Sequence, residues 1–183
     1  MKNNRMIPSV ALVMSFMLLC LCTISQAQDI KYNFDPAVDY SKYKTYKWVD
    51  VQGAQYPDQL TSNQIKQAID SQLALKGLTK TEDDNASVYV AYQIAVKEET
   101  QWDATAYGGG RFRTMGGMGT ATSSTIKIGM LALDIYDVTL KSQVWHGTAT
   151  KTLNPSKDPQ KNQERLQKAM SKLLKNYPPK VKK

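Results

Sequence analysis

The stretch VYVAYQIAVK, residues 88–97, decides the fold class. Its apolar side chains occupy every second position, at Val88, Val90, Tyr92, Ile94 and Val96. This period of two is typical of a strand with one buried face. A turn cluster, Asp83-Asp84-Asn85, lies just before it. The sequence therefore predicts a long half-buried strand here, the best defined in the chain.

Downstream of this strand, residues 101–123 lose the alternation and contain six glycines. We expect a flexible glycine-rich loop over that range, because glycine without regular spacing favours flexibility. Alternation returns at Thr125 but changes phase at Gly129, which predicts a β-bulge at that glycine. A short turn then separates this strand from a last one over residues 143–152, so the two are expected to form an antiparallel hairpin.

Upstream lie two shorter strand patterns, at residues 30–34 and 46–48. A helix follows, for which Thr61 and Gln64 fit a capping box at the start and Gly77 fits a left-handed cap at the end. A second helix is expected to begin with Asp158 as its cap and to end before Pro178-Pro179.

These elements predict an α+β domain in the order ββαβββα. We expect an antiparallel sheet of about four to five strands with both helices packed on one face, because each amphipathic helix must bury its apolar stripe against the sheet. The expected organisation is a single domain over residues 28–183, with a basic C-terminal helix and tail.

Residues 1–27 resemble a secretory signal peptide. Lys2 and Arg5 give a basic start, residues 10–22 are mainly apolar, and Ser25-Gln26-Ala27 fits a cleavage site. The alternative is a lipoprotein acylated at Cys22, although Leu21 stands where a small residue is usual. An uncleaved anchor is disfavoured because the apolar stretch is short for a membrane span. We expect an exported protein, periplasmic or extracellular, either free or lipid-anchored to the outer membrane through Cys22.

Composition excludes several classes of protein. With 42% hydrophobic residues and 24 Lys plus Arg against 16 Asp plus Glu, the chain is neither a disordered polyelectrolyte nor a multi-pass membrane protein. Both cysteines, Cys20 and Cys22, lie in the leader, so cleavage after Ala27 would remove every thiol. That excludes a disulfide framework and a cysteine nucleophile. No cofactor motif and no metal site are predicted.

Basic charge is concentrated near the C-terminus. The exposed face of the last helix carries five cations, Lys161, Arg165, Lys168, Lys172 and Lys175. Anionic lipid headgroups or acidic polymers would suit such a face in an envelope compartment, where nucleic acid is not an expected partner. The alternative is a solvated helix face beside a frayed tail.

The glycine-rich loop carries candidate contact residues for a partner, namely Tyr107, Arg111, Phe112, Arg113, Met115 and Met118. Exposed aromatic and methionine side chains favour interfaces. Two alternatives stay open: backbone amides and the two arginines cradling a phosphate, or a hairpin tip without a ligand.

Candidate catalytic residues are few. His146 is the only histidine, and Glu98, Glu99 and Asp103 are the acids nearest the loop. Asp134 lies inside an apolar strand, so it is expected to be buried with a partner. We predict no enzymatic activity, and a cavity lined by acids around His146 would contradict that prediction.

Several motifs resemble one bacterial envelope family. They are YNFDPAVDYSKYKTYKW at residues 32–48, LALDIYD at 131–137 and VWHG at 144–147. In this order they are similar to the DUF4136 family, a domain of unknown function. The resemblance implies an exported protein, often a lipoprotein in that family, and supplies no catalytic residues.

The sequence thus predicts a non-enzymatic cell-envelope interaction or structural protein. The alternative function is binding of a small apolar or lipid-like ligand between the sheet and the helices. A hydrolase that uses the acids near the loop is a third hypothesis.

Overall fold

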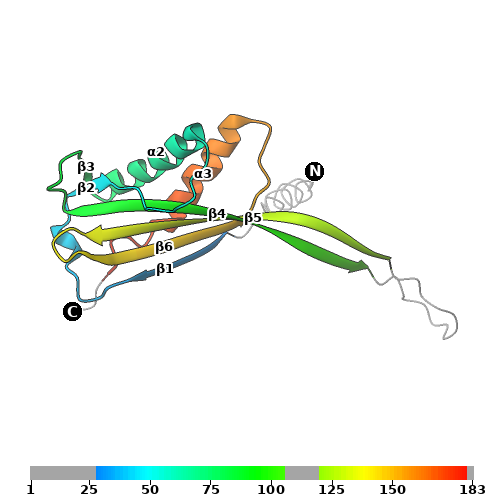
Figure 1. Cartoon of the computed structure of the whole chain (residues 1–183), viewed down its shortest axis with the longest axis horizontal. Helices are drawn as coiled ribbons and strands as arrows, with labels where there is room; N and C mark the ends of the chain where they lie inside the picture. The colour runs from blue at the N-terminus through cyan, green and yellow to red at the C-terminus, as the bar shows by residue number, and fades with distance from the viewer. Residues whose placement is uncertain (1–27, 106–119, 181–183) are drawn as a thin grey trace, which may run out of the picture.

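The computed structural model describes residues 28–105 and 120–180, with residues 101–105 and 120–122 as backbone alone. The elements, in chain order, are β1 (Asp29–Phe34), the 3-10 turn η1 (Tyr40–Lys42), β2 (Thr45–Trp48), α2 (Gln59–Leu75), β3 (Thr79–Lys80), β4 (Val88–Thr105), β5 (Thr120–Asp137), β6 (Ser142–Thr152) and α3 (Pro159–Leu173). Six strands form one sheet in the order β1-β6-β5-β4-β2-β3. Both helices lie over the same face (Figure 1).

The α+β class and the placement of both helices on one face are confirmed. The strand number and the purely antiparallel arrangement are corrected, because the sheet has six strands and β2 runs parallel to both β3 and β4. The long connection from β2 to β4 contains α2, and such a helical crossover brings the next strand back in the same direction. β3 has only two residues, too few to show any alternation.

The glycine-rich loop is shorter than predicted. Residues 101–105 pair with residues 120–124, so strands occupy both ends of the range 101–123 assigned to the loop. This segment of β4 and β5 is paired to no other strand among the described residues. The sequence of this segment lacks the hydrophobic alternation that marks a half-buried strand, so the alternation could not predict it.

The predicted bulge at Gly129 is also wrong. The pairing of β4 with β5 runs unbroken through Val96 and Gly129, and the irregularity of β5 with β6 lies between Ile135 and Tyr136. The change of phase at Gly129 instead marks where the helix-covered part of the sheet ends. At this point the Leu153 side chain lies so close that a Cβ on Gly129 would be 2.7 Å from it.

The ends of both helices follow from local hydrogen bonds. The expected capping box at Thr61 is replaced by Asp58, whose carboxylate accepts from the Thr61 backbone N–H at 3.0 Å, so α2 begins at Gln59. At the other end Gly77 has φ +85°, and the Leu78 N–H donates to the Leu73 carbonyl at 3.1 Å, as in a Schellman motif. Asp158 caps α3 as predicted, through the Gln160 N–H at 2.9 Å.

The core fills the space between the sheet and the two helices. Its largest fully buried side chains come from all the long strands and both helices, and include Tyr46, Tyr92, Leu133, Ile135, Trp145, Ile69, Leu73, Met170 and Leu173. Close packing requires glycine at position 147, because a Cβ there would be 2.3 Å from the Trp145 ring. Tyr177, just beyond α3, packs edge to face on both Trp145 and Tyr40.

Candidate functional site

The outer parts of β4 and β5 extend beyond the rest of the sheet (Figure 1). β6 pairs with β5 only from Ile128 onward, whereas the pairing of β4 with β5 continues to Thr105 and Thr120. We call this two-stranded ribbon, residues 98–105 and 120–127, the β4–β5 arm. Within the described residues no other strand pairs with either of its edges. Such edges offer unpaired N–H and C=O groups to another chain.

Charged residues flank the base of the arm. Lys127 lies 3.1 Å from Glu98, and Lys97 lies 2.9 Å from Glu99, measured between the nitrogen and the carboxylate oxygen. Val96, the residue before them on β4, is 54% exposed. The sequence-predicted contact residues Tyr107, Arg111, Phe112, Arg113, Met115 and Met118 lie outside the described residues, in the segment that joins the two strands of the arm. Their role stays a prediction.

The predicted cationic face lies on α3. Lys161, Arg165, Lys168 and Lys175 are exposed and Lys172 is half-buried. None of the five forms an ion pair with an acid in the part of the chain that the structure describes. Arg165 differs from the others because its guanidinium donates to the Asn154 carbonyl at 2.9 Å, which turns it toward the loop between β6 and α3.

A pocket of about 550 Å³ opens between the sheet and the helices, close to the base of the arm. Its floor includes Ile94, Leu131 and Ala149 from the three central strands, and its helical wall includes Ile65, Leu166 and Ala169. Volumes of 300–1,000 Å³ with mainly apolar walls are usual for small-molecule sites. The pocket therefore has the size and lining of a ligand site.

Two cations and no carboxylate line this pocket. Lys151 reaches it from β6 and Arg165 from α3. Lys151 was not predicted as a site residue from the sequence. The sequence did contain a signal for it. Lys151 shares the strand phase of Trp145 and Ala149, whose side chains are buried, so its charge lies on the face that meets the helices.

Asp134 and His146 meet on the opposite, helix-free face of the sheet. Asp134 is 5% exposed, and its Oδ1 lies 2.5 Å from His146 Nδ1 and accepts from Gln143 Nε2 at 2.6 Å. The expectation that Asp134 is buried with a partner is confirmed. Among the described residues His146 contacts no hydroxyl or thiol that it could activate, and no acid other than Asp134 bonds to it. In the part of the chain that the structure describes, the pair therefore has no nucleophile bonded to it.

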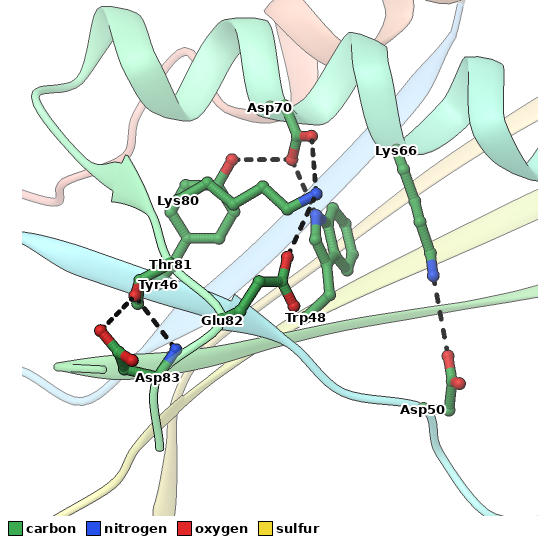
Figure 2. A network of polar contacts seen from close by, with 9 residues as sticks. All are labelled: Tyr46, Trp48, Asp50, Lys66, Asp70, Lys80, Thr81, Glu82 and Asp83. Atoms are coloured by element: carbon green, nitrogen blue, oxygen red, sulfur yellow. Dashed lines mark hydrogen bonds and ion pairs between the residues drawn. The ribbon is translucent and has the colours of Figure 1, made fainter. Parts of the chain in front are cut away.

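A polar network joins α2 to the parallel edge of the sheet (Figure 2). Asp70 Oδ1 accepts from the Tyr46 hydroxyl at 2.7 Å and from Trp48 Nε1 at 2.8 Å, while Lys80 Nζ lies 3.8 Å from its Oδ2. Burial and the hydrogen bond to Asp70 raise the pKa of Tyr46. Lys66 lies over the Trp48 ring, 5.5 Å from its centre. This network fixes the helix on the sheet, and none of its residues lines the 550 Å³ pocket.

A tyrosine cluster also holds elements together by hydrogen bonds, at the end of the sheet away from the arm. Tyr40 donates to the Val144 carbonyl at 2.5 Å, and burial raises the pKa of Tyr40 to about 12. Tyr43 donates to Asp137 Oδ2 at 2.7 Å. Burial acts to raise the pKa of Asp137, but hydrogen bonds from the Leu140 N–H and from Tyr43 outweigh it and hold that pKa below its usual value.

Neither a metal centre nor a membrane span is found in the described part of the chain. No three side chains of the metal-ligating types gather there. No helix among these residues is both long and apolar enough to cross a bilayer.

A six-stranded sheet with two helices on one face, a projecting two-stranded arm and an apolar pocket define a small α+β domain with surfaces for contact. The chain belongs to the DUF4136 family, a domain of unknown function, which it matches over residues 30–179. The resemblance read from its motifs is thus confirmed. A comparison with curated proteins finds no match.

Two solved structures share the fold at low sequence identity. A single-residue variant of PelC from Paraburkholderia phytofirmans, described as a dodecamer, is 14% identical with a TM-score of 0.50, covering 81% of this chain and 95% of that one. A PDZ domain protein from Parabacteroides distasonis is 14% identical with a TM-score of 0.56, and the match covers 98% of this chain but 42% of that one. At this identity the likeness concerns the fold.

Proposed function

We propose that this protein is a non-enzymatic component of the cell envelope that associates with further copies of itself through the β4–β5 arm. The observation that carries the proposal is the arm itself, whose two strands pair with no other strand of the described residues over 98–105 and 120–127, the Lys127 carbonyl at its base alone accepting from the Leu153 N–H at 2.7 Å. A two-stranded hairpin without further cover is marginally stable in water. Pairing of an arm edge with another chain would satisfy its free backbone groups and bury its side chains.

Two further facts support this proposal. PelC, which shares the fold, is described as a dodecamer, so a domain of this shape is compatible with a symmetric assembly. The predicted leader over residues 1–27 would place the protein outside the cytoplasm, with Cys22 acylated or removed by cleavage after Ala27. The cationic face of α3 would then be available to anionic lipid headgroups or acidic polymers.

The absence of enzymatic activity is part of the proposal. It is supported by the isolation of the Asp134–His146 pair, which lies on the helix-free face, whereas the pocket lies on the other face. Turnover of an envelope substrate that is lost on changing His146→Ala would overturn this part.

Removal of the arm tests the proposed assembly. We would replace residues 98–127 by an Asn-Gly turn between Lys97 and Ile128, which already face each other in the β4–β5 pairing. The protein purified from the envelope is expected to be oligomeric, and the shortened variant monomeric, by sedimentation velocity. The shortened variant should still unfold cooperatively on heating, followed by far-ultraviolet circular dichroism, which shows that the body still folds. A variant with the same oligomeric state as the full chain contradicts the proposal.

A second candidate function is binding of a small apolar or lipid-like ligand. The pocket between the sheet and the helices favours it, because its walls are mainly apolar and its volume is about 550 Å³. This function needs no assembly, so it can hold whether or not the arm associates.

A further inference from the structure

Exposed apolar side chains gather at the pocket. Val96 and Leu153 are two of the eight large hydrophobic residues that are exposed in the described part of the chain, and both line it. Met130, a third, also borders the pocket, but on β5 it shares the strand phase of Asp134, which lies on the helix-free face. The remaining five are not among its lining residues. Apolar surface that is clustered around a concave site is typical of a binding site rather than of ordinary surface.

The two cations of the pocket have no acidic partner. Arg165 uses one N–H on the Asn154 carbonyl, and a guanidinium has four others to donate. Lys151 forms no ion pair among the described residues. The acids that cap the two helices at this end, Asp58 and Asp158, bond to their own first turns and do not line the pocket.

We propose that the pocket binds a single-chain amphiphile with an anionic head, of the class of fatty carboxylates. The tail lies between the sheet and the helices, over Ile94, Leu131 and Ala149. The head is held by Lys151 and Arg165. This inference rests on the second candidate function and adds to it the charge of the ligand and the residues that recognise it. The apolar floor requires a hydrocarbon, and the unpaired cations require an opposite charge.

The probes are dodecanoate, dodecanol and dodecyltrimethylammonium, each titrated below micelle formation into the protein purified from the envelope and followed by calorimetry. Dodecanoate is expected to bind at least roughly tenfold more tightly than dodecanol, since a hydrogen bond to a charged group is worth about that factor. The cationic amphiphile should bind more weakly still. Decanoate should bind up to about fourfold more weakly than dodecanoate for each methylene lost.

Charge reversals identify the head site. Arg165→Glu and Lys151→Glu should each weaken dodecanoate binding by roughly tenfold or more and leave dodecanol binding within about twofold. Lys168→Glu is the matched control, because Lys168 is exposed on α3 and does not line the pocket, and it should change neither affinity appreciably. Unchanged thermal unfolding of the variants excludes loss of the fold as the cause.

The possible failures are distinguishable. Equal affinity for dodecanoate and dodecanol, or equal effects of Arg165→Glu and Lys168→Glu, overturns the anionic head but keeps the ligand-binding function. If no probe binds, the second candidate function fails as well.

Discussion

β4 and β5 run through both the body of the sheet and the β4–β5 arm, and the exposure of their side chains changes along the way. On β4, Val88 and Val90 are fully buried under the helices, whereas Val96, in the same strand phase and two residues before the arm begins, is 54% exposed. Backbone pairing continues without a break from one region to the other. The difference teaches that the helices, and not the length of the strands, decide where this sheet is stable.

The same comparison separates polar groups that hold the fold together from charged groups that are available to bind a ligand. In the body, Asp70 and Asp137 are each bonded by aromatic hydroxyl or indole donors and hold elements together. Around the arm base and the pocket, Lys151 and Arg165 have no acidic partner among the described residues. Charges that are already satisfied stabilise the fold, and charges that are not satisfied are free to bind.

The largest effect is expected in the body, at Trp145. Trp145→Ala removes a side chain that is 1% exposed and packs on Tyr177, so the free energy of unfolding should fall by about 3–5 kcal/mol. Urea unfolding followed by circular dichroism measures it. The matched change near the arm, Val96→Ala, should cost less than about 0.5 kcal/mol. Similar losses for the two variants would contradict the contrast between the two regions.

A smaller loss is expected at Asp70. Asp70→Ala leaves the Tyr46 hydroxyl and Trp48 Nε1 without their shared acceptor, which should cost about 1–3 kcal/mol in unfolding free energy. Asp50→Ala serves as the control, because Asp50 is exposed and its ion pair with Lys66, at 3.8 Å, lies at the surface. If both variants lose the same amount, the network in Figure 2 does not anchor α2.

The pH dependence of stability sharpens the comparison further. The pKa of Asp137 is lower in the folded protein than in the unfolded chain, so its contribution is present above the unfolded pKa of about 3.9 and is lost as the pH falls through the folded pKa. Asp137→Asn, which stays neutral, should therefore lose less unfolding free energy than the wild type between about pH 5 and pH 2. If the unfolding free energies of the variant and the wild type change in parallel with pH, Asp137 does not supply this pH-dependent stability.

The smallest effect is expected at the arm base. Lys127→Ala removes the ion pair with Glu98. The Lys127 side chain is 62% exposed and the Glu98 side chain 61% exposed. Solvent screening limits such a pair to less than about 0.5 kcal/mol, and added salt should remove the difference. A loss above about 1 kcal/mol would mean that the arm base is packed against something in solution.

Local sequence signals predicted the elements of the body well. The alternation from Val88 to Val96 predicted the central strand, and Gly77 and Asp158 predicted the helix ends, because the relevant contacts lie within a few residues. The start of α2 was misplaced because Asp58 and Thr61 both fit an N-cap, and the choice depends on backbone geometry. The arm was missed because its sequence lacks the apolar alternation by which a strand is predicted.

The candidate site was predicted only in part. Arg165 was identified as a surface cation, but its position at the pocket depends on a bond to Asn154 and on the approach of α3 to the sheet. Lys151 was not predicted as a site residue, although it carries a charge in the strand phase of the buried Trp145 and Ala149. The pocket combines residues from β4, β5, β6, α2 and α3, which no single window of sequence contains.

The sequence by itself determined the α+β class, the two amphipathic helices, the cationic face and the family, because each depends on the order and spacing of residues along the chain. The tertiary structure alone decided that β2 runs parallel to β4, that Asp134 meets His146, and that Lys151 and Arg165 share one pocket. Those arrangements join residues far apart in the chain. They are fixed by how the helices cover the sheet, which only the packing of all the layers together can set.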